Sequence, residues 1–168
     1  ELCSGDLLES LWLDSSLTNN INRFSYMGTP AAIITYTLKS NTTTITKNNT
    51  KKEITQDIFS YLDQQLKKQP IQNNALPFPF LGGFVGYFGY ELKVLTGAKK
   101  KTQNSSYPDS LWFSVKNFLA LDHHKKEIYL VSVTDKKKAA DEWFGGIKRK
   151  LKISCHSEWS ESGIEESS

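Results

Sequence analysis

The sequence predicts an α+β domain in which antiparallel hairpins pack with two or three helices. Two observations support this class. Apolar runs rich in β-branched residues flank polar turn segments, as in hairpins, and two other segments repeat apolar residues at helical spacing. The chain has 168 residues, of which 38% are hydrophobic and 12% aromatic, enough for the core of one domain. We therefore expect one domain over residues 1–153, followed by a tail.

The first half of the chain contains two apolar segments that are expected to be strands, residues 7–13 (LLESLWL) and 32–38 (AIITYTL). A polar connection rich in Ser, Thr and Asn separates them. Residues 41–50 (NTTTITKNNT) are polar and turn-rich, but their Thr/Ile centre suits a short exposed strand. This predicts a hairpin between residues 32–38 and the segment that follows.

An amphipathic helix is predicted from Thr55 onward. Apolar residues recur there every four positions, at Ile54, Ile58, Leu62 and Leu66. Thr55 is the expected N-cap, and Asp57 lies near the positive end of the helix dipole. Two lysines precede Pro70, which is expected to end the element.

A glycine-rich segment follows a proline-punctuated loop at residues 76–80. Four glycines, Gly82, Gly83, Gly86 and Gly89, fall among bulky aromatic residues. Glycine weakens a strand, so this cluster suggests that another backbone or a large ring packs against the main chain. The spacing fits neither the dinucleotide-binding fingerprint nor the phosphate-binding loop. We therefore predict a structural glycine motif.

The second half predicts another hairpin and a last helix. Apolar runs at residues 111–121 and 128–133 enclose the polar segment 122–126, which is typical of a hairpin. The helix is expected from Lys136 to Leu151 with Asp135 as its N-cap, although two central glycines weaken it. Residues 154–168 are acidic and rich in Ser and Glu, so they are expected to be a disordered tail.

Charge and aromatic content bear on nucleic-acid binding. The net charge is +3, and all the basic residues except Arg23 and Arg149 are lysines, which favours a solvated surface over nucleic-acid recognition. Six aromatic residues allow two interpretations, a platform for stacking bases or part of the core: Trp12, Trp112, Phe84, Tyr87, Phe88 and Tyr90. Strong salt dependence of binding would separate the two. We expect no nucleic-acid partner.

The residues suggest no catalytic or metal site. Cys3 and Cys155 lie far apart without a C-x-x-C spacing, which favours a reducing cytoplasm over disulfides or zinc. His123 and His124 are adjacent in a predicted turn, and neither alone makes a metal site or a catalytic dyad. No stretch approaches the roughly 20 apolar residues of a membrane span. We therefore expect no cofactor in this chain and no membrane association.

Several segments, taken in order, resemble one family. They are Trp12-Leu13-Asp14-Ser15-Ser16, residues 23–28 (RFSYMG), Leu76-Pro77-Phe78, residues 82–93 (GGFVGYFGYELK), Pro108-Asp109 and Leu121-Asp122-His123. The set resembles the N-terminal region of component I of aminodeoxychorismate synthase, a relative of anthranilate synthase component I. The resemblance covers roughly residues 6–153 and looks most like forms fused behind a glutamine amidotransferase domain.

The resemblance implies a fold and a ligand pocket. The fold is the α+β N-terminal domain of the anthranilate synthase component I type, with antiparallel sheets. The family's N-terminal region helps to form a buried tryptophan pocket. By matching motifs, Ser15, Asn22, Arg23 and Phe24 would line it. Phe24 would stack on the indole, while Arg23 would pair with the carboxylate and Ser15 would donate to it.

The resemblance also implies a reaction that this chain would not perform alone. The complete enzyme converts chorismate and glutamine-derived ammonia to 4-amino-4-deoxychorismate, for 4-aminobenzoate and folate. Chorismate and Mg²⁺ are bound in the family's larger C-terminal domain, which the 168 residues do not include. We expect an inactive cytoplasmic fragment with exposed apolar surface, whose partners are that chorismate-binding domain and a glutamine amidotransferase. The alternatives are the N-terminal domain of anthranilate synthase component I, from tryptophan biosynthesis, or a non-catalytic tryptophan-binding or interaction module.

Overall fold

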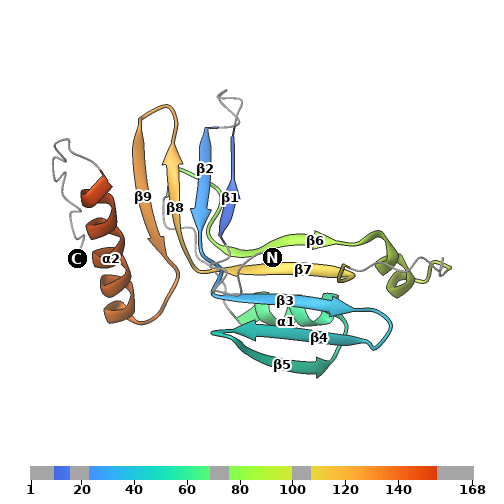
Figure 1. Ribbon diagram of the computed structural model, residues 1–168. Coiled ribbons are helices and arrows are strands. Elements are labelled where there is room, and N and C mark those ends of the chain that lie inside the picture. The colour runs from blue at the N-terminus through green and yellow to red at the C-terminus, as the bar shows by residue number, and fades with distance from the viewer. Residues whose placement is uncertain (1–9, 16–22, 69–75, 100–106, 155–168) are drawn as a thin grey trace, which may run out of the picture. The chain divides into compact units, whose positions relative to one another are not determined.

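The computed structural model describes residues 10–15, 23–68, 76–99 and 107–154. The chain divides into two units, Glu1–Val133 and Thr134–Ser168. The first unit contains two antiparallel sheets, a helix and a 3-10 helix, and the second contains a helix (Figure 1). The predicted α+β class, with antiparallel hairpins and two or three helices, is confirmed, and the described residues contain three helices.

The larger sheet has five strands in the order β5-β4-β3-β7-β6. The strands are β3 (Ala32–Thr37), β4 (Thr42–Lys47), β5 (Thr50–Thr55), β6 (Gly83–Phe88) and β7 (Ser110–Val115). The β3–β4 hairpin was predicted. Strand β5 was not, because its Lys51-Lys52-Glu53 sequence lacks the apolar alternation that marks a strand. Asn48 and Asn49 both have positive φ and form the two-residue β4–β5 turn, a conformation that asparagine tolerates well.

Helix α1 (Ile58–Lys68) begins three residues later than predicted. The carboxylate of Asp57 accepts the backbone N–H of Ser60 at 2.9 Å, so Asp57 caps the helix. The prediction of Thr55 as N-cap is wrong, since Thr55 ends β5 and Ile54 belongs to that strand. Apolar spacing did not show where the strand ends. Ile58 and Leu62 are buried and belong to a core cluster with residues of β3.

The smaller sheet has four strands in the order β1-β2-β8-β9. They are β1 (Leu11–Leu13), β2 (Phe24–Gly28), β8 (Asn117–Asp122) and β9 (Glu127–Ser132). The β8–β9 hairpin was predicted, whereas no strand was expected over β2. Only the second part of the apolar run 111–121 belongs to this hairpin, because the run is divided between β7 and β8. The chain leaves the larger sheet at Lys116, a polar break in the run, and enters the smaller one (Figure 1).

An aromatic core packs against the smaller sheet. Phe78, in the proline-punctuated loop, is buried and makes edge-to-face contacts with rings of β2, β8 and β9: Phe24, Tyr26, Phe118 and Tyr129. Such pairs add to the stabilisation that burial supplies. The loop is therefore anchored at Phe78 between segments that are distant in sequence.

The glycine segment forms β6 and leads into the 3-10 helix η1 (Tyr90–Thr96), which the sequence did not predict. A Cβ on Gly86 would lie 2.0 Å from the Leu111 carbonyl oxygen of the neighbouring strand, and one on Gly89 would lie 2.5 Å from the carbonyl oxygen of Asp109. Gly82 and Gly83 instead have positive φ values of 88° and 109°. Another backbone thus approaches Gly86 and Gly89, as predicted, and also Gly82, whose added Cβ would lie 2.8 Å from the Val115 carbonyl oxygen. At Gly83 the backbone conformation alone favours glycine.

Helix α2 (Lys137–Ser154) belongs to the second unit and continues through Gly145 and Gly146. Its first turn is closed by a hydrogen bond from the Ala140 N–H to the Lys136 carbonyl. The N-cap is therefore Lys136, and the prediction of Asp135 is wrong by one residue. Within the described ranges, no helix has the length and apolar character needed to cross a membrane. The predicted tail beyond residue 154 lies outside the described residues.

Candidate functional site

Three of the four residues predicted to line a tryptophan pocket lie together at one end of the smaller sheet. Ser15 follows β1, and Arg23 and Phe24 stand at the start of β2. Strand β2 pairs with β8 so that Phe24 is opposite Asp122. Asn22 lies outside the described residues. The antiparallel register thus brings the start of β2 to the turn between β8 and β9.

The charged centre of this region is the pair formed by Arg23 and Asp122. Arg23 Nε donates to Asp122 Oδ1 at 2.7 Å, and Nη2 donates to Oδ2. The Asp122 carboxylate also accepts the backbone N–H groups of His124 and Lys125. The hydrogen bonds from Arg23 are the main reason that the pKa of Asp122 falls far below its usual value. Asp122 therefore stays ionised, although it is only 2% exposed.

A second hydrogen-bond network surrounds the buried hydroxyl of Ser25. This oxygen accepts the backbone N–H of Ser15 at 3.0 Å and donates to Asp14 Oδ1 at 3.1 Å. His123 Nε2 lies 2.6 Å from it. Because the hydroxyl proton is directed to Asp14, the imidazole N–H must be the donor in the contact with His123. The histidine therefore joins the β8–β9 turn to β2.

Each predicted pocket residue in the described region already has an intramolecular partner. The Ser15 hydroxyl donates to the Phe24 carbonyl at 2.7 Å. The Phe24 ring meets Phe78 edge to face, and the Arg23 guanidinium carbon lies 4.9 Å from the centre of the Phe24 ring. A ligand carboxylate would therefore compete with Asp122 for Arg23.

The sequence did not predict the hydrogen bonds that Asp122 and His123 make with Arg23 and Ser25. It assigned both to a turn, but only His123 lies there, since Asp122 is the last residue of β8. An aspartate just before a polar turn is a usual acceptor for turn N–H groups. The contacts with Arg23 and Ser25 join residues almost a hundred positions apart, which no local pattern reveals. Within the described ranges, no three His, Cys, Asp or Glu side chains gather into a group that could hold a metal ion.

The ordered motifs and the two antiparallel sheets can be compared with known proteins. Residues 12–164 match the family model of chorismate binding enzymes, and the chain belongs to this family. The family resemblance inferred from the motifs is confirmed.

Two curated proteins similar to this chain are both named aminodeoxychorismate synthase. The chain is 33% identical over 144 residues to a probable chloroplastic aminodeoxychorismate synthase of Oryza sativa subsp. japonica. The aligned region covers 76% of this chain and 16% of the rice protein. The chain is 29% identical over 153 residues to an aminodeoxychorismate synthase of Streptomyces pristinaespiralis, covering 83% and 21%. The chain thus spans about a fifth or less of the length of these relatives.

The fold is also found in a solved structure. Anthranilate synthase component I from Streptococcus pneumoniae superposes with a TM-score of 0.61 at 19% identity, over 86% of this chain and 32% of that one. At this identity the match concerns the fold. It confirms the predicted architecture of the anthranilate synthase component I type.

Proposed function

We propose that this chain is the N-terminal part of component I of an aminodeoxychorismate synthase. The complete enzyme would convert chorismate and glutamine-derived ammonia to 4-amino-4-deoxychorismate, for 4-aminobenzoate and folate biosynthesis. The observation that carries the proposal is the match to relatives named aminodeoxychorismate synthase over three quarters or more of this chain.

The 168 residues are proposed to be inactive by themselves. They correspond to 16% and 21% of the length of the two relatives, so most of such an enzyme would lie in other sequence. The described residues also offer no group suited to the Mg²⁺ of the complete enzyme. We assign the metal and chorismate to a chorismate-binding domain, and the ammonia supply to a glutamine amidotransferase. Both are the proposed partners of this chain.

A pair of chimeric enzymes tests the proposal. Residues 12–153 would replace the matching segment in the Streptomyces aminodeoxychorismate synthase and in the pneumococcal anthranilate synthase component I. We expect the first chimera to form 4-amino-4-deoxychorismate from chorismate and ammonia and the second to be impaired. The converse result would favour the alternative, an N-terminal domain of anthranilate synthase component I. Each host lacking the segment is the control, and turnover by the isolated 168-residue chain would contradict its proposed inactivity.

A tryptophan-binding module is the second candidate, supported by the convergence of Ser15, Arg23 and Phe24. Binding would require Arg23 to exchange the Asp122 carboxylate for that of the ligand. Calorimetry with tryptophan should therefore show loss of binding in Arg23→Ala and tighter binding in Asp122→Asn. Arg149→Ala, which removes the other arginine, is the matched control. An absence of binding heat in the unmodified chain would remove this candidate.

The compartment is proposed from composition. The widely separated cysteines suit a reducing cytoplasm. Fractionation of the source cells with an antibody against this chain would test the assignment.

A further inference from the structure

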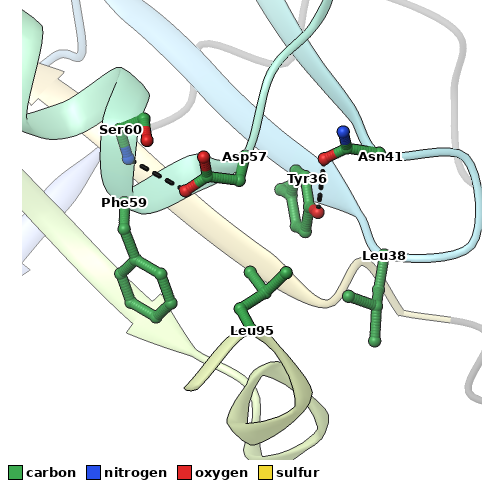
Figure 2. Close-up of a pocket in the computed structure, with 7 residues that line it drawn as sticks. All are labelled: Tyr36, Leu38, Asn41, Asp57, Phe59, Ser60 and Leu95. Carbon is green, nitrogen blue, oxygen red and sulfur yellow. Dashed lines mark hydrogen bonds between the residues drawn. The ribbon is translucent and has the colours of Figure 1, made fainter. Parts of the chain in front are cut away.

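A hollow of about 510 Å³ lies on the α1 side of the five-stranded sheet, and neither Arg23 nor Asp122 lines it. Figure 2 shows the side chains that surround it. Tyr36 and Leu38 come from the end of β3, Asn41 from the turn before β4, Asp57 and Phe59 from the start of α1, and Leu95 from η1. Its volume lies within the range of small-molecule sites.

The polar wall of the hollow is formed by Tyr36, Asn41, Asp57 and Ser60. Tyr36 Oη donates its proton to Asn41 Oδ1 at 2.9 Å, and Tyr36 is only 1% exposed, so its hydroxyl serves the fold (Figure 2). The backbone N–H of Ser60 points to the Asp57 carboxylate and is not free for a ligand. The Asp57 carboxylate, which is half-buried, is therefore the acceptor on this wall that a donor group of a ligand would reach.

The same wall carries negative charge. Hydrogen bonds from Ser60 lower the pKa of Asp57, which keeps this carboxylate ionised at neutral pH. Burial, followed by the charges of Asp57 and Asp109, raises the pKa of Tyr36, so the phenol remains protonated. No residue that lines the hollow is basic. An anionic ligand would thus meet a carboxylate and no basic side chain in the lining, whereas an ammonium group would be attracted.

The opposite wall is apolar. Leu38, Phe59 and Leu95 face the hollow, and Phe59 and Leu95 are 36% and 37% exposed (Figure 2). Covering these side chains with the apolar body of a ligand would remove hydrocarbon surface from water. The aromatic ring of Phe59 also suits contact with another ring.

We propose that this hollow binds a small monocationic amine with an apolar or aromatic body and no carboxylate. The half-buried Asp57 carboxylate receives the ammonium group, and Leu38, Phe59 and Leu95 contact the rest of the molecule. The site is separate from the tryptophan candidates and does not depend on the proposed function of the chain.

The test uses two probes of similar shape and opposite charge. The full 168-residue chain is titrated with 2-phenylethylamine and with 3-phenylpropionate, and binding is followed by the amide resonances of residues around the hollow. We expect saturable shifts at Asn41, Phe59, Ser60 and Leu95 with the amine and none with the acid. Equal responses to both probes, or no response to the amine, would overturn the proposal.

Asp57→Asn separates the charge from the fold. Asparagine is as good an N-cap as aspartate, so the helix start is retained while the negative charge is lost. We expect about a tenfold weaker affinity for the amine. Asp63→Asn removes the same charge from the next turn of α1, outside the hollow, and is the matched control with unchanged affinity. An unchanged affinity in Asp57→Asn contradicts the assignment.

A second variant tests the site even if Asp57→Asn fails to fold. Leu95 is partly exposed on η1, so Leu95→Arg places a positive charge at the hollow with little loss of core packing. Amine binding should disappear while thermal unfolding remains near that of the unmodified chain. Retention of amine binding by a folded Leu95→Arg chain would also reject the proposal.

Discussion

Arg23 and Asp122 are 99 positions apart, yet their side chains form a bidentate salt bridge at the end of the smaller sheet. Arg23 immediately precedes β2, and Asp122 is the last residue of β8. The backbone N–H of His123 also donates to the Arg23 carbonyl. Side chain and backbone therefore hold the β8–β9 turn against the start of β2.

Replacing Asp122 by alanine should destabilise the fold. The change removes the acceptor for Arg23 and for two N–H groups of the turn. We expect a loss of about 2 kcal/mol in the free energy of unfolding, measured by urea denaturation. Asp63→Ala breaks an exposed pair with Lys67 and should cost no more than about 0.5 kcal/mol. Equal effects of the two variants would contradict the structural role of Asp122.

The Arg23–Asp122 pair should also make stability depend on pH. The pKa of Asp122 is lower in the folded chain than in the unfolded one, so its contribution is fully present above the unfolded value of roughly 3.9. It is lost as the pH falls below that value toward the folded pKa. Urea denaturation from pH 7 to pH 3 should therefore show the unmodified chain losing its advantage over Asp122→Asn. A constant difference between the two chains would argue against this linkage.

Gly86→Ala should be among the more damaging substitutions in β6. The added methyl group would lie 2.0 Å from the Leu111 carbonyl oxygen and cannot be accommodated without separating β6 from β7. We expect a cost of about 3 kcal/mol, seen as a lower thermal midpoint. Gly145→Ala is the control, and it is expected to stabilise the chain instead of destabilising it. It replaces a glycine within α2, so it should raise the helix content measured by circular dichroism. A thermal midpoint unchanged by Gly86→Ala would show that the strands can separate without cost.

The isolated chain should self-associate. Phe59, Leu66 and Phe88 line one hollow between α1 and β6 and are 36%, 56% and 46% exposed. Such a group of large apolar side chains is typical of a contact surface. Sedimentation should show association that increases with concentration, and Leu66→Lys should reduce it. Gln64→Lys adds the same charge on an exposed position of α1 and should not. A monomer with cooperative unfolding at every concentration would contradict this expectation.

Local patterns predicted several elements of the fold. The hairpins at β3–β4 and β8–β9 and the body of α1 follow from alternation, turn residues and apolar spacing. Strand β5 escaped prediction because its polar side chains suit an exposed edge, and η1 because it follows directly on an extended strand. Of the candidate site, the sequence indicated Ser15, Arg23 and Phe24, whereas their partners Ser25, Asp122 and Phe78 required the structure.

By itself, the sequence determined the family, the α+β class and the candidate residues, because ordered motifs and short-range periodicity lie along the chain. Only the tertiary structure decided that the run from Leu111 to Leu121 divides between two sheets at Lys116. It also decided that Arg23 meets Asp122, and that residues of β3, α1 and η1 enclose an acidic hollow. These features depend on which strands pair and which elements share a sheet face. Long-range packing sets both, and it does so through contacts between residues that are not neighbours in sequence.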